Sequence, residues 1–384
     1  MKRITLTMLF ALLWCASMVA QSYNFKTVVY RDPNVSFTQL LGINNNNVIA
    51  GYHNFQQNQG FTLVLPNAFT TENFPNSMMT QVVGINNTGT TDGFYVDNSG
   101  ITHGFYKSNG QFKTVDFPNP QIATSFNQLL SQNDYYEAAG YYSNSIANTT
   151  PDIPYVYDEI GGVFHVLTIP GAVNGAQATG INNSGMVCGF WIDANNVNHG
   201  YLINRGIFMT LDYPNSTFTQ ALGLNNRGQV VGSWIDGSNQ MHGFVYTIGT
   251  AKFVSVDEPN GVGTTLVNGI NDAGTLVGFF GTAPINTGFV AIPVGQETSG
   301  VEPLSGGANL PPANSPVAVP GIHPLTSRTT LPPSVSPVAK QLSSDSNLPT
   351  ARTPVAVPQV RDSERLSGGE TLPSALAPAA VDAR

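Results

Sequence analysis

The sequence predicts an all-β chain that folds as a six-bladed β-propeller closed by its N-terminal strand. A motif with an Asn-containing turn followed by two strand-like runs occurs six times, at intervals of 42 to 49 residues. Repeats of this length with many short apolar runs are typical of β-repeat folds, and four strands per repeat match one propeller blade. The copies begin at Gly42, Gly84, Ser131, Gly180, Gly223 and Gly269.

Residues 1–22 read as a secretory signal peptide. Lys2 and Arg3 precede an apolar run over residues 4–20 that is short for a membrane anchor. We therefore expect an exported protein, periplasmic or extracellular. Cleavage would remove Cys15 and leave Cys188 as the single thiol, which excludes an internal disulfide. Other copies carry Ala or Val at that position, so Cys188 is expected to be a small buried apolar residue.

The turn that starts each copy predicts a tight hairpin between the first and second strands. Glycine at its fourth position adopts a positive φ without a steric clash, and the first copy has Asn47 there instead. The third copy has Tyr136 at this position, so we expect its turn to differ locally. An asparagine that can bond turn backbone groups occurs in every copy, as Asn44, Asn86, Asn133, Asn182, Asn225 and Asn271.

The second strand of every copy contains a glycine, which inside a strand indicates a bulge or a close backbone approach. We expect neighbouring sheets to pack closely at these glycines, which are Gly51, Gly93, Gly140, Gly189, Gly232 and Gly278. Aromatic residues follow, and a core role is expected for them. They are Tyr52, Phe94, Tyr141, Phe190 and Phe279 in the second strand, and Phe61, Phe105, Tyr155, Tyr201, Phe244 and Phe289 in the third.

The two ends of the repeat region favour a closed ring over an open solenoid. The last copy stops after its third strand, and the missing fourth strand is found at the other end, where "FKTVVYRDPN" (25–34) resembles "FKTVDFPN" (112–119). Pairing of this segment with the last blade would leave no open edge, whereas a solenoid would need caps that the sequence does not offer. The propeller is expected to span residues 23–294.

The phrases "GINNTGTTDGFYVDNSGITHGFY", "GINNSGMVCGFWIDANNVNHGYL" and "GLNNRGQVVGSWIDGSNQMHGFV" resemble the extracellular HAF-type repeats of exported bacterial proteins. The likeness covers residues 23–294. It departs from the family motif in having Gly104, Gly200 and Gly243 where the motif has alanine, and three of the six copies keep the histidine. The resemblance implies export and a propeller-like repeat, but no chemistry.

Residues 295–384 differ sharply in composition from the repeats. This stretch holds 14 of the 26 prolines and no Phe, Trp or Tyr, so it cannot build a core and is expected to be a disordered spacer. The repeat region itself carries 7 Lys or Arg against 16 Asp or Glu. This net negative charge disfavours nucleic acid as a partner, and no other segment is apolar enough for membrane insertion. We expect a monomer.

Three Asp and His pairs, each six residues apart, flank the turn between the second and third strands. They are Asp97 and His103, Asp193 and His199, and Asp236 and His242. Each pair could be a hydrogen bond that fixes the turn or half of a metal site. Because each pair alone has too few ligands for a closed zinc site, the structural interpretation is favoured. We expect no cofactor and no bound metal.

The third copy is the most irregular, and a single ligand or substrate site requires that the symmetry of the repeat be broken. Its candidate ligand-binding residues are Asp134, Tyr135, Tyr136, Glu137, Tyr141, Tyr142 and Tyr155. Tyrosines beside polar groups suit a glycan or a protein ligand. The alternative is a hydrolase or lyase acting on an extracellular polymer through carboxylates such as Asp134, Glu137, Asp158 and Glu159. No catalytic motif occurs, so binding is favoured over catalysis.

Overall fold

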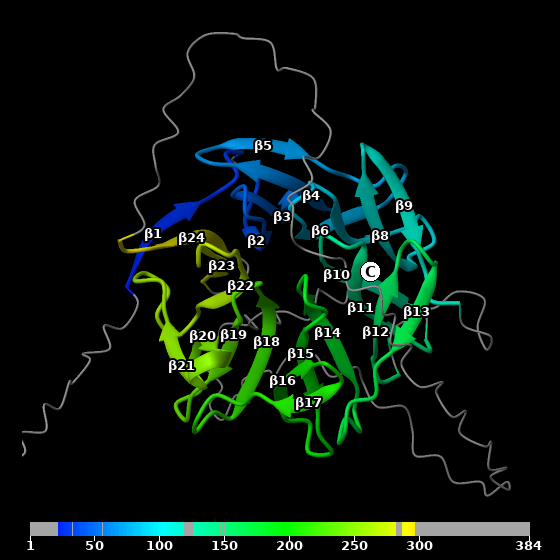
Figure 1. Ribbon diagram of the computed structural model, residues 1–384. Coiled ribbons are helices and arrows are strands. Elements are labelled where there is room, and N and C mark those ends of the chain that lie inside the picture. Colours follow the sequence, from blue (N-terminus) through cyan, green and yellow to red (C-terminus); the bar gives the residue numbers. More distant parts are fainter. Residues whose placement is uncertain are drawn as a thin grey trace, which may run out of the picture. The chain divides into compact units, whose positions relative to one another are not determined.

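The computed structural model describes residues 22–295, except residues 33, 56, 119–125, 146, 147, 149 and 282–285. The predicted signal peptide and Pro-rich tail therefore lie outside the described residues, apart from Ser22 and Gly295. Six four-stranded antiparallel sheets surround a central axis as the blades of a propeller (Figure 1). The described part of the chain contains no helix with the length and hydropathy needed to cross a membrane.

Each blade is a meander whose first strand lies nearest the axis. Blades 1 to 5 consist of β2–β5, β6–β9, β10–β13, β14–β17 and β18–β21, and blade 6 of β22–β24 with β1. The first strands are β2 (Thr38–Ile43), β6 (Met79–Ile85), β10 (Phe126–Gln132), β14 (Ala176–Ile181), β18 (Phe218–Leu224) and β22 (Leu266–Ile270). The second strands are β3 (Val48–Phe55), β7 (Thr91–Val96), β11 (Glu137–Ser143), β15 (Val187–Ile192), β19 (Gln229–Ile235) and β23 (Leu276–Phe280).

The outer half of each blade has the same order. The third strands are β4 (Gln57–Val64), β8 (Thr102–Ser108), β12 (Ile153–Asp158), β16 (Asn198–Asn204), β20 (Met241–Thr247) and β24 (Thr287–Pro293). The fourth strands are β5 (Ala68–Thr71), β9 (Gln111–Val115), β13 (Val163–Val166), β17 (Ile207–Thr210), β21 (Lys252–Val256) and β1 (Tyr23–Val28). A 3-10 turn (Ile248–Thr250) joins β20 to β21.

The N-terminal strand closes the ring as predicted. β1 pairs antiparallel with β24, from Tyr23 opposite Pro293 to Val28 opposite Gly288. Val28 is buried in a cluster with residues of blades 1 and 6, and Phe25 packs its ring 5.6 Å from that of Phe289. The last blade is thus completed by residues from the other end of the repeat region, so that it has four strands like the other five.

The glycines of the second strands lie against the first strand of their own blade. The expectation that neighbouring sheets pack closely at these glycines is therefore wrong. A Cβ on these six glycines would lie 1.9–2.3 Å from a carbonyl oxygen of the first strand of the same blade, as between Gly232 and Gln220. A register shift in that first strand follows one position later, between Ala221 and Gly223 in blade 5. Neighbouring blades instead touch at first-strand glycines, where a Cβ on Gly223 would lie 2.6 Å from the Asn268 carbonyl oxygen.

The aromatic residues predicted for the core are buried. Every predicted core aromatic of the second and third strands has an exposed fraction of 6% or less, which confirms that prediction. Cys188 is fully buried among residues such as Leu202 and Ala221, and burial raises the pKa of its thiol to about 12. It is therefore an apolar core residue without thiolate character near neutral pH.

Candidate functional site

The blades present two faces with different chemistry. Because successive strands are antiparallel, the turns between first and second strands and those between third and fourth strands lie at one end of the ring. We call this end the Asn face, after the turns that contain Asn44 and its five equivalents. The opposite end, with the turns between second and third strands, is called the His face.

A closed cycle of hydrogen bonds runs around the Asn face. The side-chain Nδ2 of the turn asparagine in each blade donates to the backbone oxygen of the corresponding asparagine in the next blade. The six bonds are 3.0–3.2 Å long and link Asn44 to Asn86, Asn86 to Asn133, Asn133 to Asn182, Asn182 to Asn225, Asn225 to Asn271 and Asn271 to Asn44. We call this cycle the Asn ladder. All six asparagines are buried, so each bond satisfies groups that water cannot reach.

A second cycle lies beside the Asn ladder and is formed by the next residue of each turn. Each backbone N–H donates to the side-chain Oδ1 of the equivalent residue in the next blade, at 2.8–2.9 Å. Four of these residues are asparagine, and Asp134 and Asp272 stand opposite each other. Burial acts to raise the pKa of Asp272, but bonds from Asn226 and Asn45 and the charge of Arg227 outweigh it and lower this pKa.

The first strands enclose a central cavity of about 150 Å³ that opens toward these two cycles. Gln81, which lines it, is 1% exposed, and neither its Nε2 nor its Oε1 has a hydrogen-bond partner among the described residues. In blade 1 the equivalent Gln39 accepts a bond from the Tyr52 hydroxyl at 2.6 Å, whereas blade 2 has Phe94 at the tyrosine position. A polar cavity of this kind accommodates ordered water.

Blade 3 breaks the symmetry of the Asn face. Its turn has the same backbone shape as the others, because Tyr136 adopts a φ of +65°, close to the +59° of Asn47 and the +71° of Gly185. The expectation that this turn differs locally is therefore wrong, since the cycles of hydrogen bonds impose one turn conformation on every blade. Tyr135 and Tyr136 are 64% and 42% exposed, so the left-handed tyrosine is not held by burial of its ring.

Two apolar side chains of the same blade accompany these tyrosines. The backbone oxygen of Tyr136 accepts a 2.9 Å bond from the N–H of Glu159, which ties the first turn of blade 3 to the turn between β12 and β13. Ile160, in that second turn, is 79% exposed, and Val163 at the start of β13 is 46% exposed. We call Tyr135, Tyr136, Ile160 and Val163 the blade-3 patch.

Carboxyl groups flank the residues of the blade-3 patch in the sequence of its two turns. Asp134 accepts bonds from Asn87 and Asn183 of the neighbouring blades, and Glu137 accepts one from Asn133 at 2.7 Å. Asp158 stands opposite Glu137 across β11 and β12 and accepts bonds from the N–H groups of its own turn.

Glu159 differs from these carboxyls in its environment. Its Oε1 accepts a bond from Nε2 of Gln132. Burial raises the pKa of Glu159 to about 7, with Lys113 acting to lower it and Asp158 to raise it.

The other predicted ligand-binding tyrosines lie inside the blade. Tyr141 and Tyr155 are fully buried and Tyr142 is 8% exposed. The Tyr141 hydroxyl donates to Oε1 of Gln128 at 2.8 Å, and Tyr142 stacks on Phe117 with ring centroids 3.7 Å apart. The structure therefore does not bring these three side chains to the surface on which Tyr135 and Tyr136 lie.

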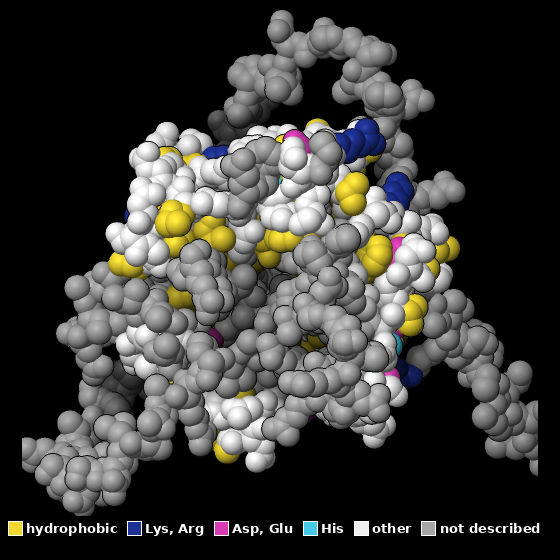
Figure 2. Space-filling model, turned by 180° about the vertical axis from the view of Figure 1, so that it is seen from behind, with side chains coloured by type: hydrophobic (Ala, Val, Ile, Leu, Met, Phe, Trp, Pro, Cys, Tyr) yellow, Lys and Arg dark blue, Asp and Glu magenta, His cyan; other side chains and the backbone are white. Residues whose placement is uncertain are grey.

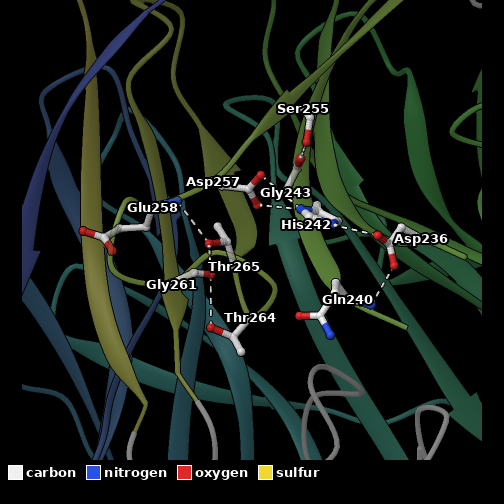
Figure 3. Close-up of polar contacts among 10 residues, drawn as sticks. All are labelled: Asp236, Gln240, His242, Gly243, Ser255, Asp257, Glu258, Gly261, Thr264 and Thr265. Atoms are coloured by element: carbon white, nitrogen blue, oxygen red, sulfur yellow. Dashed lines mark hydrogen bonds and ion pairs between the residues drawn. The ribbon is translucent and has the colours of Figure 1, made fainter. Parts of the chain in front are cut away.

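The three histidines on the His face each lie between two carboxylates. Nδ1 bonds to the aspartate that follows the fourth strand, at 2.8 Å for His103 and Asp116, 2.9 Å for His199 and Asp212, and 3.0 Å for His242 and Asp257. Nε2 lies farther from the aspartate of the turn, at 3.5 Å for Asp97, 3.8 Å for Asp193 and 3.7 Å for Asp236. Figure 3 shows this arrangement around His242.

Sequence reasoning paired each histidine with the turn aspartate and missed the closer one. The missed signal is the aspartate that ends "TVD", "TLD" and "SVD" in the blades with a histidine. Each histidine also stacks on an aromatic ring of the second strand, His103 on Tyr95, His199 on Trp191 and His242 on Trp234. Within the described residues no group of three or more His, Cys, Asp or Glu side chains is arranged to hold a metal ion. Each histidine with its two aspartates therefore connects the third strand to the turn before it and to the loop that follows the fourth strand.

No protein-family model and no curated protein matches the chain. Among solved structures, TolB from Acinetobacter baumannii is 14% identical with a TM-score of 0.43, and the match covers 59% of this chain and 55% of that one. The fucose-recognising lectin of Aleuria aurantia, a six-bladed propeller, is 9% identical with a TM-score of 0.43, covering 72% and 98%. A chain of a nidogen/laminin complex is 12% identical with a TM-score of 0.38, and the match covers 63% of this chain and 85% of that one.

Proposed function

We propose that this chain is an exported binding module that holds a protein ligand on the blade-3 patch, with the propeller as a rigid scaffold and the Pro-rich region as a spacer. Export follows from the signal-like residues 1–22, and the spacer from the composition of residues 295–384. Binding sites on propellers lie on turns that a rigid ring positions, and the blade-3 patch is built from two such turns.

The conformation of Tyr136 carries this proposal. A left-handed backbone costs a residue with a Cβ roughly 1–2 kcal/mol, and sister blades avoid the cost with glycine or asparagine. Tyr136 bears the cost while 42% of it remains exposed. The hydrogen bonds of the Asn face hold this strained backbone, whereas burial of the ring does not compensate it, and backbone strain of this kind clusters at residues that contact a ligand.

The chemistry of the blade-3 patch favours a protein over a glycan. Ile160 and Val163 add branched aliphatic surface to the two tyrosines, and an exposed mixed aromatic and aliphatic patch is typical of protein contacts. Asp134, Glu137 and Asp158 flank its residues in the sequence of the two turns. The expected ligand is therefore a segment with basic side chains beside an apolar anchor.

The test is a binding screen of the full mature chain against displayed peptides and a glycan array, with a Tyr135→Ser, Tyr136→Asn double variant. Loss of peptide binding by at least roughly tenfold is expected, because truncation of an aromatic anchor costs about 2 kcal/mol or more. Val262→Ser is the matched control, since Val262 is 66% exposed on a loop of the opposite face. Absence of peptide binding, or equal loss in the control, contradicts the proposal; tyrosine-dependent glycan binding reassigns the ligand class.

A polymer-cleaving enzyme is the second candidate, and the environment of Glu159 favours it. A carboxyl with a pKa near 7 can donate a proton near neutral pH, and Asp158 is its neighbour in sequence. The check is release of reducing ends from extracellular polysaccharides by the natural chain and by Glu159→Gln. Cleavage that Glu159→Gln abolishes would replace binding with catalysis as the function.

A further inference from the structure

A cleft between blades 1 and 2 on the His face is lined mainly by uncharged polar side chains. It lies between the hairpin of β3 and β4 and the loop from β5 to β6, and its volume is about 570 Å³. Volumes of a few hundred Å³ or more are usual for ligand pockets. Its polar lining includes Gln57, Asn58, Gln59, Asn73, Asn76 and Ser77.

The cleft exists because blade 1 departs from the repeat. β3 and β4 have eight residues each and pair as far as Phe55 opposite Gln57. In blades 2, 4 and 5 an aspartate closes the hairpin by accepting bonds from two N–H groups of its own turn, as Asp97 does from Ser99 and Ile101. Blade 1 has Phe55 at that position, and the Oδ1 of the preceding residue, Asn54, accepts bonds from the N–H groups of Ser36 and Phe37 in the loop before β2. The hairpin therefore extends beyond its sister turns.

The lining is polar but carries no charge. None of the described side chains that line the cleft is Asp, Glu, Lys, Arg or His. A carboxamide offers two donors and an acceptor with two lone pairs, so three or four of them together match a ligand that presents many hydroxyl groups. On the side of the molecule that Figure 2 shows, few of the visible side chains are coloured as Lys, Arg, Asp or Glu. These four residue types make up 10% of the whole sequence.

Several of these carboxamides are available to a ligand. Asn73 uses its Oδ1 to accept a bond from the N–H of Gly60 at 3.1 Å, which leaves its Nδ2. Gln57, Asn58 and Asn76 make no side-chain hydrogen bond to any other described residue. Asn76 is held at a φ of +60° by its loop, which places it without the help of side-chain contacts.

Apolar surface completes the cleft. Phe74 lies in it with its ring stacked on Tyr95 at 3.7 Å, and Met78 is 42% exposed. A sugar presents hydroxyl groups at its edge and C–H groups on its faces, so it needs both kinds of surface. An anionic sugar would find no cation in the lining, and a purely apolar ligand would leave the carboxamides unpaired.

We propose that this cleft binds a neutral carbohydrate, with the carboxamides of Gln57, Asn58 and Asn76 as its hydrogen-bonding groups and Phe74 and Met78 as its apolar surface. The inference does not depend on the blade-3 patch, because the two sites lie on opposite faces and on different blades. A chain with both sites would connect a protein ligand to a glycan.

The test uses the full mature chain and a panel of neutral mono- and disaccharides, with uronic acids and sulfated sugars as the charged arm, measured by saturation-transfer NMR and calorimetry. Asn76→Gly removes one carboxamide while keeping the positive φ. It is expected to weaken binding roughly tenfold, the loss of about one hydrogen bond. Gln57→Ala combined with Asn76→Gly is expected to abolish binding.

The matched control is Asn215→Gly, because Asn215 follows a proline in the equivalent loop between blades 4 and 5 and has a φ of +62°. It should leave sugar binding unchanged, as should the Tyr135→Ser, Tyr136→Asn variant, so failure of either proposal is separable from failure of the other. The proposal is overturned if no neutral sugar binds at millimolar concentration, if Asn76→Gly binds like the natural chain, or if the charged arm binds more tightly.

Discussion

Asn271 donates its side-chain N–H to the backbone oxygen of Asn44 at 3.2 Å, across 227 residues of sequence. This bond completes the Asn ladder, and β1 completes the sheet of the same blade. The ring is thus closed twice, once around the axis by turn residues and once at the rim by a strand. Each closure can be removed separately.

Removal of residues 23–36 opens the rim. We expect the melting temperature to fall by roughly 10 °C or more, because a domain of this size loses about 2–4 °C per kcal/mol and β1 buries Val28 against blades 1 and 6. Differential scanning calorimetry provides the measurement. A synthetic peptide of residues 23–36 should restore part of the loss, and a truncated chain that melts like the intact one would show that β1 does not close the ring.

Asn182→Ala breaks one link of the Asn ladder. It leaves the Asn225 oxygen without this bond and removes the Oδ1 that accepts from the N–H groups of Ser184 and Met186. A loss of about 2–4 kcal/mol in the free energy of unfolding is expected, since each buried polar group left unpaired costs about 1–3 kcal/mol. Urea titration measures it. Exposed Asn195→Ala serves as the control and should change stability by less than about 0.5 kcal/mol.

Tyr136→Asn should stabilise the chain while it weakens ligand binding. Asparagine tolerates the left-handed backbone, so about 1 kcal/mol of strain is relieved. The reverse change, Gly185→Tyr in blade 4, should destabilise by about the same amount. Chemical denaturation of both variants tests this pair, and a destabilised Tyr136→Asn would mean that the tyrosine is held by packing.

Stability should fall as pH rises from about 4 to about 8, and Asp92 is the carboxyl with the largest contribution of its own. Burial raises the pKa of Asp92 to about 8, with a smaller contribution from Glu159, so the folded chain keeps a proton that the unfolded chain releases near pH 4. At Asp92 the unfolded state then binds fewer protons, so this group alone lowers the free energy of unfolding by roughly 1.4 kcal/mol per pH unit in this window.

Asp92→Ala isolates that effect, because blades 1 and 3 have Ala50 and Ala139 at the same position. The stability advantage of the variant should widen steadily from pH 5 to pH 7, as followed by urea titration at several pH values. Glu159 and Asp152, whose pKa values burial raises to about 7, should leave a residual slope in the variant. A constant difference between the two proteins would show that Asp92 is ionised in the folded state.

Chelation should leave the melting temperature unchanged within error. Asp97, Asp193 and Asp236 each use Oδ1 to accept bonds from two N–H groups of their own turn, and Oδ2 lies near a histidine Nε2, so each turn offers few of the roughly six to eight oxygens that calcium takes. Thermal melts with and without EDTA, followed by added calcium, are the check. A fall that calcium reverses would establish a metal site in these turns.

Much of the architecture follows from the sequence alone, since the six-fold recurrence of the turn, the strand glycine and the aromatic residues identifies the blade. The displaced "FKTVVY" segment identifies the closure. These features are local, because hairpin turns and strand alternation depend on residues close in sequence. The buried aromatic residues are likewise predictable, as is Cys188, because sister copies share their environment.

Other features depend on residues that meet only across blades, and periodicity could not reveal them. The Asn ladder links residues 42 to 227 positions apart, and it forces Tyr136 into the shape of its glycine sisters. Tyr141 and Tyr135 belong to the same irregular copy, yet Tyr141 lies inside β11 and is buried, whereas Tyr135 lies in the turn before that strand and is exposed. The sequence determined the blade and its repetition; tertiary packing decided which polar and aromatic groups face a ligand, because only neighbouring blades determine what remains uncovered.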